Sequence, residues 1–171
     1  MKELLKSGFE QLNIEVSEKQ IDMLVRYSQL LVEWNEKMNL TAITDPEGIA
    51  VKHFLDCLAY LKRAKIPEGA RVADVGTGAG FPGVVLKIAR PDIKLVLIDS
   101  LQKRLNFLDT VLNEIGVNTH EKGRSFQICL CFYATTEAIT QKIARLTTVR
   151  MEQTPEAMVK SSLLRPRLGA R

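Results

Sequence analysis

The spacing of apolar residues predicts helices along the first third of the chain. Residues 2–13 and 17–38 place apolar side chains three and four positions apart, as amphipathic helices do. Ser17 and Gln20 have the spacing of a capping box, which predicts where the second helix begins. Asp45, followed by proline, predicts a third helix that continues to about Leu61. We expect Trp34 in the core, because it falls on the apolar side of its helix.

Beyond a turn at residues 66–69, short apolar runs alternate with helical segments. We predict strands at 71–75 and 94–98 and helices at 82–89 and 101–115, with Gly116 as the C-cap of the last helix. Alternation of this kind is typical of an α/β fold whose parallel sheet is covered by helices on both faces. Residues 125–134 predict a further strand and 136–146 a short helix, whereas no clean period follows Thr147.

Length and composition favour one globular unit. The chain has 171 residues, 46% of them hydrophobic, which is enough for one substantial core. We divide it into an N-terminal helical extension (1–66), a Rossmann-like cofactor-binding core (67–117) and a divergent C-terminal segment (118–171). No apolar run is long enough to span a membrane, and we expect no signal peptide because residues 1–20 contain no uninterrupted apolar segment. We expect a monomer.

Cysteine usage points to a reducing compartment. The chain has three cysteines, Cys57, Cys129 and Cys131, and this odd, sparse set is typical of reduced thiols in a cytoplasmic protein. Cys129 and Cys131 would lie on one face of a strand, but two ligands do not make a zinc site. We therefore expect a cytoplasmic localisation and no bound metal.

Charge is distributed unevenly along the chain. Residues 1–119 hold 15 basic and 16 acidic side chains, whereas residues 120–171 hold 9 and 4. The whole excess of the net charge of +4 therefore lies in the C-terminal segment. A basic segment can bind phosphates.

A glycine-rich turn carries the candidate chemistry. The run D-V-G-T-G-A-G-F-P-G at 74–83 follows the first predicted strand, and Asp99 ends the second. Glycines let the backbone approach a ligand closely, and Asp99 can accept hydrogen bonds from both ribose hydroxyls of an adenosine. Residues 78–83 also satisfy the dinucleotide pattern G-x-G-x-x-G, so a nicotinamide coenzyme competes with S-adenosylmethionine (SAM) as the ligand.

Two further motifs, taken together with this turn, favour SAM. W-N-x-x-x-N-L-T at 34–41, H-x-x-D at 53–56 and D-V-G-x-G-x-G-x-P at 74–82 occur together. In this combination the chain resembles the bacterial small-subunit ribosomal RNA guanine-N7 methyltransferases (RsmG/GidB), from about residue 3 to about residue 117. The resemblance implies a class I SAM-dependent methyltransferase fold, SAM as cofactor, and N7 of a guanine in 16S rRNA, free or in the small ribosomal subunit, as substrate.

The cofactor residues that we expect are those of the turn and of the next strand end. They are Asp74, Gly76, Gly78, Gly80, Phe81 and Asp99. The glycines and Phe81 would line the methionine part of SAM, Asp74 would order the loop, and Asp99 would bind the ribose. The alternatives are a plain strand-end carboxylate for Asp74 and a helix cap for Asp99.

On the substrate side we expect Asn39, Thr41 and His53. Local capping is the alternative for Asn39 and Thr41, and a structural histidine is the alternative for His53. Lys103 and Arg104 could meet phosphate or form a solvated face. We name no catalytic base, because N7 of guanine has a free lone pair and no proton to remove.

The C-terminal segment departs from the family pattern. After residue 117 we find neither the acidic turn that would contact adenine nor the arginine-bearing substrate loop of related enzymes, so we expect an incomplete sheet. Our hypothesis is a frameshifted or truncated reading frame. Three functions therefore stay open at this point: the rRNA methyltransferase, a dinucleotide-dependent oxidoreductase, and an inactive cofactor-binding remnant.

Overall fold

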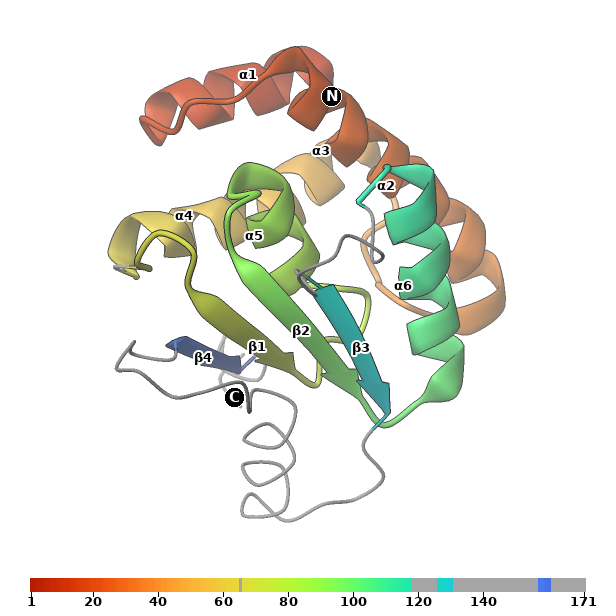
Figure 1. The fold of residues 1–171 in the computed structure, drawn as a ribbon. Helices are drawn as coiled ribbons and strands as arrows, with labels where there is room; N and C mark the ends of the chain where they lie inside the picture. The colour runs from red at the N-terminus through yellow and green to blue at the C-terminus, as the bar shows by residue number, and fades with distance from the viewer. Residues whose placement is uncertain (65, 118–125, 131–156, 161–171) are drawn as a thin grey trace, which may run out of the picture.

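A four-stranded parallel sheet forms the centre of the protein (Figure 1). The structure is a computed structural model that describes residues 1–64, 66–117, 126–130 and 157–160. The strands lie in the order β3-β2-β1-β4 and comprise β1 (Arg71–Val75), β2 (Lys94–Asp99), β3 (Phe126–Leu130) and β4 (Ala157–Lys160). The chain proceeds from β1 outward through β2 and β3 and returns to the other side of β1 with β4. Ligands of such sheets bind at the carboxyl ends of the strands beside this reversal.

The strand register brings the two acidic strand ends together. Val75, the last residue of β1, pairs with Ile98 of β2, so that Asp99 lies beside the turn that follows β1. Side chains alternate between the faces of the sheet. Leu95 and Leu97 join the main core, whereas Ala73 and Ile98 form a small separate cluster on the opposite face.

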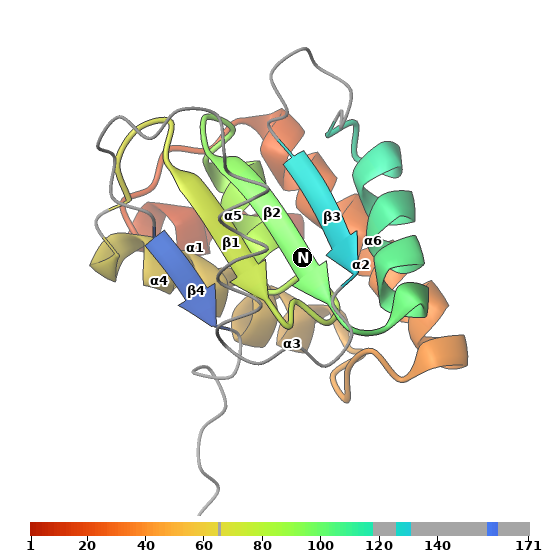
Figure 2. The ribbon, with the colours of Figure 1, turned by 60° about the horizontal axis from the view of Figure 1, so that its bottom comes forward.

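The helices of the described ranges gather on one face of the sheet (Figure 2). Helix α5 (Gly83–Ala89) packs on β1 and β2, and α6 (Gln102–Glu114) packs on β2 and β3. Every residue of α5 is buried, because the N-terminal helices cover its outer side. Our expectation of helices on both faces is not met within the described ranges.

The N-terminal extension is built from two long and three short helical segments. Helix α1 (Lys2–Gln11) and helix α2 (Glu18–Met38) are followed by a segment that changes its winding, and Ser17 and Gln20 form the predicted capping box of α2. The Gln20 side-chain amide also donates to the carbonyl of Ile88 at 2.7 Å, which ties α2 to α5. The segment after α2 contains α3 (Pro46–Ile49), a π-helical turn η1 (Ala50–Leu55) and α4 (Asp56–Arg63).

The predicted elements are confirmed within a few residues over residues 2–117. Of the strand expected at 125–134 the structure describes residues 126–130, which form β3, and the remaining residues lie outside the described ranges; β4 was not predicted. Four residues are too few for an alternating pattern to be recognised, which explains why β4 was missed. The helix expected at 136–146 and Cys131 lie outside the described residues.

Candidate cofactor site

The turn after β1, which we call the cofactor loop (residues 76–82), folds back against the end of β2. The backbone N–H groups of Gly76 and Thr77 both donate to the Ile98 carbonyl, at 2.8 and 3.1 Å. Gly76, Gly78 and Gly80 have φ angles of 76°, 60° and 99°, which L-residues with side chains rarely adopt. The sequence therefore needs glycine at these positions to make the turn.

Asp74 lies beneath the cofactor loop and is hydrogen-bonded to Thr77 and Gly83. It is fully buried, and its Oδ2 accepts hydrogen bonds from Thr77 Oγ1 at 2.8 Å and from the Gly83 N–H at 3.0 Å. Its Oδ1 is buried without a hydrogen-bond partner. Burial raises the pKa of Asp74 to about 6, and the two hydrogen bonds oppose that shift.

Asp99 joins the cofactor loop to helix α6. Its Oδ2 accepts from the Gly78 N–H, its Oδ1 accepts from the Leu101 N–H, both at 2.9 Å, and the Arg104 guanidinium lies 3.5 Å from Oδ2. Asp99 is not the helix cap that we considered as an alternative, because the N-cap of α6 is Leu101 and has no side-chain hydrogen bond. An ionised carboxylate has about four acceptor positions, so these bonds leave capacity for ribose hydroxyls. The role of Asp99 in ribose binding stays a prediction.

Gly78 and Gly80 face different surroundings although they are two residues apart. Apart from its chain neighbours, a Cβ atom on Gly78 would meet no atom of the described residues within 4 Å. A Cβ atom on Gly80 would lie 2.6 Å from Tyr27 Oη, 2.8 Å from Leu108 Cδ2 and 2.9 Å from Val84 Cγ2. Gly78 therefore borders open space that a ligand can enter, whereas Gly80 is packed against the protein.

Phe81 connects the cofactor loop with the N-terminal helices. Its ring stacks on the imidazole of His53 with a centroid distance of 4.6 Å and an interplanar angle of 14°. It also packs on Tyr27 and Phe54, with centroid distances of 5.5 and 6.1 Å. The peptide bond between Phe81 and Pro82 is cis. Phe81 is thus part of an aromatic cluster between the cofactor loop and the N-terminal helices.

His53 is held between Phe81 and the loop that follows α2. Its Nε2 lies 2.8 Å from Thr41 Oγ1, and that oxygen accepts the Ile43 N–H at 3.0 Å. The Thr41 hydroxyl hydrogen is therefore available to Nε2. Burial lowers the pKa of His53, partly opposed by the charge of Asp56. These contacts agree with the alternative of a structural histidine. A role of His53 toward a substrate stays a prediction.

Asn39 and Thr41 make the turn at the end of α2. Asn39 is exposed and adopts the left-handed conformation (φ 49°) that ends the helix, and the Thr41 N–H donates to Asn35 Oδ1 at 2.8 Å. Local capping thus describes both residues, and contact with a substrate stays a prediction. Trp34 is half-buried and packs on Phe107 of α6 at a centroid distance of 5.7 Å.

The predicted residues therefore form one site with two sides. Gly78 donates directly to Asp99, whereas Asp74 holds the loop through Thr77 and Gly83. Phe81 stacks on His53, which in turn lies next to Thr41. Asn39 and Lys103 take no part in these contacts.

Sequence reasoning missed Tyr27 and Asn35. Tyr27 lies three residues after Leu24 and four before Leu31, on the buried face of α2, and a buried tyrosine hydroxyl needs a partner. That combination was the available signal. Leu101 was also missed, and its large exposed fraction (40%) beside Asp99 places apolar surface at the carboxyl end of β2.

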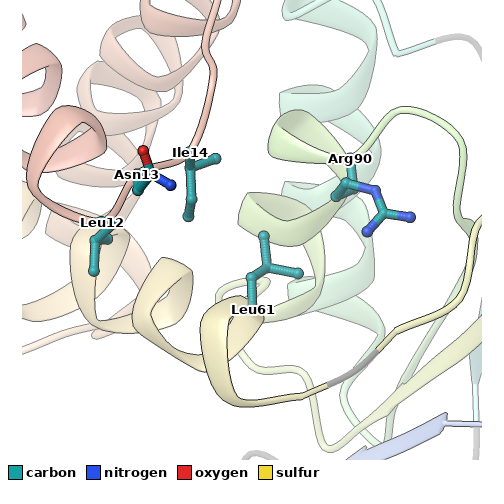
Figure 3. A pocket seen from close by; sticks show the side chains of 5 residues that line it. All are labelled: Leu12, Asn13, Ile14, Leu61 and Arg90. Carbon is teal, nitrogen blue, oxygen red and sulfur yellow. The ribbon is translucent and has the colours of Figure 1, made fainter.

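A separate hollow lies at the other end of α5 (Figure 3). It is lined by Leu12, Asn13, Ile14, Leu61 and Arg90. The Arg90 guanidinium points away from Asn13 and Ile14 and pairs with Asp92 at 2.7 Å. Since α5 begins at the cofactor loop and ends at Ala89, this hollow is not part of the site.

The described part of the chain contains neither a membrane-spanning helix nor a cluster of metal ligands. None of its helices is both long and apolar enough to cross a membrane. Within the same ranges no three His, Cys, Asp or Glu side chains come together as metal ligands. Cys57 is buried, which raises the pKa of its thiol.

Relatives of known family match the part of the chain that contains the site. The chain is 50% identical over 114 residues to the ribosomal RNA small subunit methyltransferase G of Alkaliphilus oremlandii, covering 67% of this chain and 48% of the relative. The namesake from Desulfitobacterium hafniense is 46% identical over 142 residues, covering 80% of this chain and 58% of the relative. The chain thus spans about half the length of these curated relatives.

A solved structure and a family model also match this chain. A protein-L-isoaspartate O-methyltransferase from Plasmodium falciparum, in complex with S-adenosyl-L-homocysteine, covers 82% of this chain and 67% of its own, with 15% identity and a TM-score of 0.49. This likeness is too weak to add to the assignment. The family model GidB, rRNA small subunit methyltransferase G, matches residues 20–122. The predicted class I methyltransferase fold is thereby confirmed, and the chain belongs to the rRNA small subunit methyltransferase G family.

Proposed function

We propose that this chain binds SAM and transfers its methyl group to N7 of a guanine in 16S rRNA, free or in the small ribosomal subunit. The observation that carries the proposal is the cofactor loop, with Asp74 beneath it and Asp99 beside it, inside the part of the chain that matches the family. The family assignment argues against the dinucleotide-dependent oxidoreductase. Gly83, the last glycine of the G-x-G-x-x-G pattern, lies against Leu97 and Asp74. This position suits SAM and a nicotinamide coenzyme equally and does not distinguish between them.

The residues of the site fit SAM. The open space next to Gly78 provides room for the methionine part, and the remaining acceptor positions of Asp99 suit the two ribose hydroxyls. Leu101 would offer apolar surface to the adenine ring. When bound, SAM supplies a methyl group on a sulfonium, which is already a strong donor.

The protein then has to orient rather than to deprotonate. Since guanine N7 carries no proton, no general base is required, and alignment of the reacting atoms contributes up to about 7–11 kcal/mol in ideal cases. We place Thr41 and His53 on the substrate side, because they are connected to the cofactor loop through Phe81. The exposed Lys103, in the first turn of α6, can meet a phosphate of the RNA.

Two measurements test the proposal. Calorimetry should detect binding of SAM and not of NAD, and incubation with methyl-labelled SAM and small ribosomal subunits should place label in 7-methylguanine of 16S rRNA. Absence of SAM binding would contradict the proposal as a whole. Binding without transfer to either subunits or free RNA would identify the chain as an inactive cofactor-binding remnant.

A further inference from the structure

A buried tyrosine of the N-terminal extension contacts the cofactor loop from the side opposite the sheet. Tyr27 lies in the middle of α2 and is fully buried, and its hydroxyl donates a hydrogen bond to the carbonyl of Ala79. Burial raises the pKa of this hydroxyl well above its usual value. The hydroxyl therefore keeps its proton, and remains a donor, at any pH at which the protein is used.

The other anchors of the loop come from the sheet and from the loop itself. Gly76 and Thr77 bond to the end of β2, Gly78 bonds to Asp99, and the N–H groups of Gly80 and Phe81 bond to the Thr77 carbonyl. Tyr27 adds a contact from an element more than 50 residues earlier in the chain. The loop is thus gripped between the sheet and α2.

The position of the Tyr27 hydroxyl is itself fixed. Its ring packs on Phe54, Phe81 and Phe107 with centroid distances of 5.5, 5.5 and 6.5 Å. The hydroxyl also lies against the backbone of Gly80, where a Cβ atom would come within 2.6 Å of the oxygen. A rigid ring with its polar end on two successive loop residues can define the path of a glycine-rich segment that has little conformational preference of its own.

We propose that Tyr27 is a positioning residue for the cofactor loop. It touches no reacting atom, and it acts by holding Ala79 and Gly80 in the conformation that receives the ligand. That the ligand is SAM rests on the proposed function above. The positioning of the loop does not, because it is a property of the free protein.

The test compares Tyr27→Phe with Ser28→Ala. The first variant keeps the ring and removes only the hydroxyl that reaches Ala79. The second removes a neighbouring buried hydroxyl that donates to the Val25 carbonyl of the same helix at 2.7 Å and is not bonded to the loop. Tyr27→Phe removes a hydrogen bond from the buried Ala79 carbonyl and Ser28→Ala removes one from the partly buried Val25 carbonyl, so both lower stability, and Ser28→Ala controls for that effect.

Two readouts separate positioning from general destabilisation. Hydrogen exchange of the free, full-length protein should be about tenfold faster at the amides of Gly80 and Phe81 in Tyr27→Phe and unchanged there in Ser28→Ala. Calorimetry at a temperature at which all proteins are folded should give an about tenfold weaker Kd for SAM in Tyr27→Phe alone, which corresponds to about 1.4 kcal/mol.

The outcomes are distinguishable. Unchanged exchange of the loop amides in Tyr27→Phe, an equal change in Ser28→Ala, or an unchanged Kd for SAM in a variant with faster exchange would each overturn the proposal. If wild-type protein binds no SAM while the loop amides respond as expected, the proposed function fails and the positioning of the loop by Tyr27 stands.

Discussion

The variant Gly80→Ala should be less stable than the variant Gly78→Ala. Both glycines have positive φ angles, and an L-residue there costs about 1–2 kcal/mol. At Gly78 we expect no further cost, because the new methyl group meets no atom within 4 Å in the described part of the chain other than those of its chain neighbours. At Gly80 the methyl group collides with Tyr27, Val84 and Leu108, and overpacking of this kind costs about 1–3 kcal/mol more.

The free energy of unfolding should therefore fall by about 1–2 kcal/mol in Gly78→Ala and by about 2–5 kcal/mol in Gly80→Ala. The three neighbours of Gly80 are buried in the core and have little room to shift. Alanine also restricts the unfolded chain, but it does so equally in both variants, so that the difference reports the contacts of the folded state.

Urea denaturation followed by circular dichroism measures both values. When the same variants are titrated with SAM, Gly78→Ala should lose more affinity than its stability suggests. Its new methyl group occupies the space assigned to the ligand and should weaken binding at least tenfold despite the small loss of stability. A Gly80→Ala variant as stable as Gly78→Ala would refute the packing argument. A Gly78→Ala variant with wild-type affinity would refute the position of the ligand.

Three further predictions concern single side chains. Asp99→Ala should weaken SAM binding by about 1.5–3 kcal/mol in calorimetry, because hydrogen bonds to a charged group are lost, and an unchanged Kd would remove Asp99 from the site. Asp74 has a pKa of about 6 in the folded protein and an ordinary pKa of 3.8, so the native state keeps its proton to a higher pH than the unfolded chain does. The stability that this proton contributes is full below pH 3.8 and is lost as pH rises through 6. Stability of wild type should fall by on the order of 3 kcal/mol more than that of Asp74→Asn across this range in urea denaturation, and parallel pH profiles would contradict the assignment. Thr41→Val keeps the shape of the side chain but removes the acceptor of the Ile43 N–H and the partner of His53, so the free energy of unfolding should drop by about 1–3 kcal/mol, and no loss would mean that these bonds are not important for stability.

Local signals in the sequence were sufficient for most elements of residues 2–117. The capping box at Ser17, the proline after Asp45 and the glycine after α6 each act over a few residues, and the structure has a boundary at each of them. The π-helical turn at residues 50–55 could not be predicted, because its apolar pattern differs little from that of an α-helix. β4 is placed by its partner β1, more than 80 residues earlier, and a single short strand contains no record of that pairing.

The candidate site shows the same division. Asp74, the glycines and Asp99 are close in sequence, and their grouping follows from one strand, one turn and one further strand. The contacts of Phe81 with His53 and of Tyr27 with Ala79 join segments that are 28 and 52 residues apart, and only the packing of the helical extension on the sheet brings them together. Sequence patterns therefore predicted the loop and its two acidic neighbours and missed the contacts with the N-terminal helices.

The complete burial of α5 has a consequence for protein engineering. Because one continuous core includes Leu5 and Phe9 of α1 as well as Leu105 and Leu112 of α6, the extension and the sheet share their hydrophobic interior. Proteolytic cleavage in the turn at residues 66–69 would leave two fragments, neither of which could shield α5 from water. The N-terminal extension therefore cannot be replaced by the extension of a distant homologue, because each of its helices would have to fit the surface of the sheet domain on which it packs.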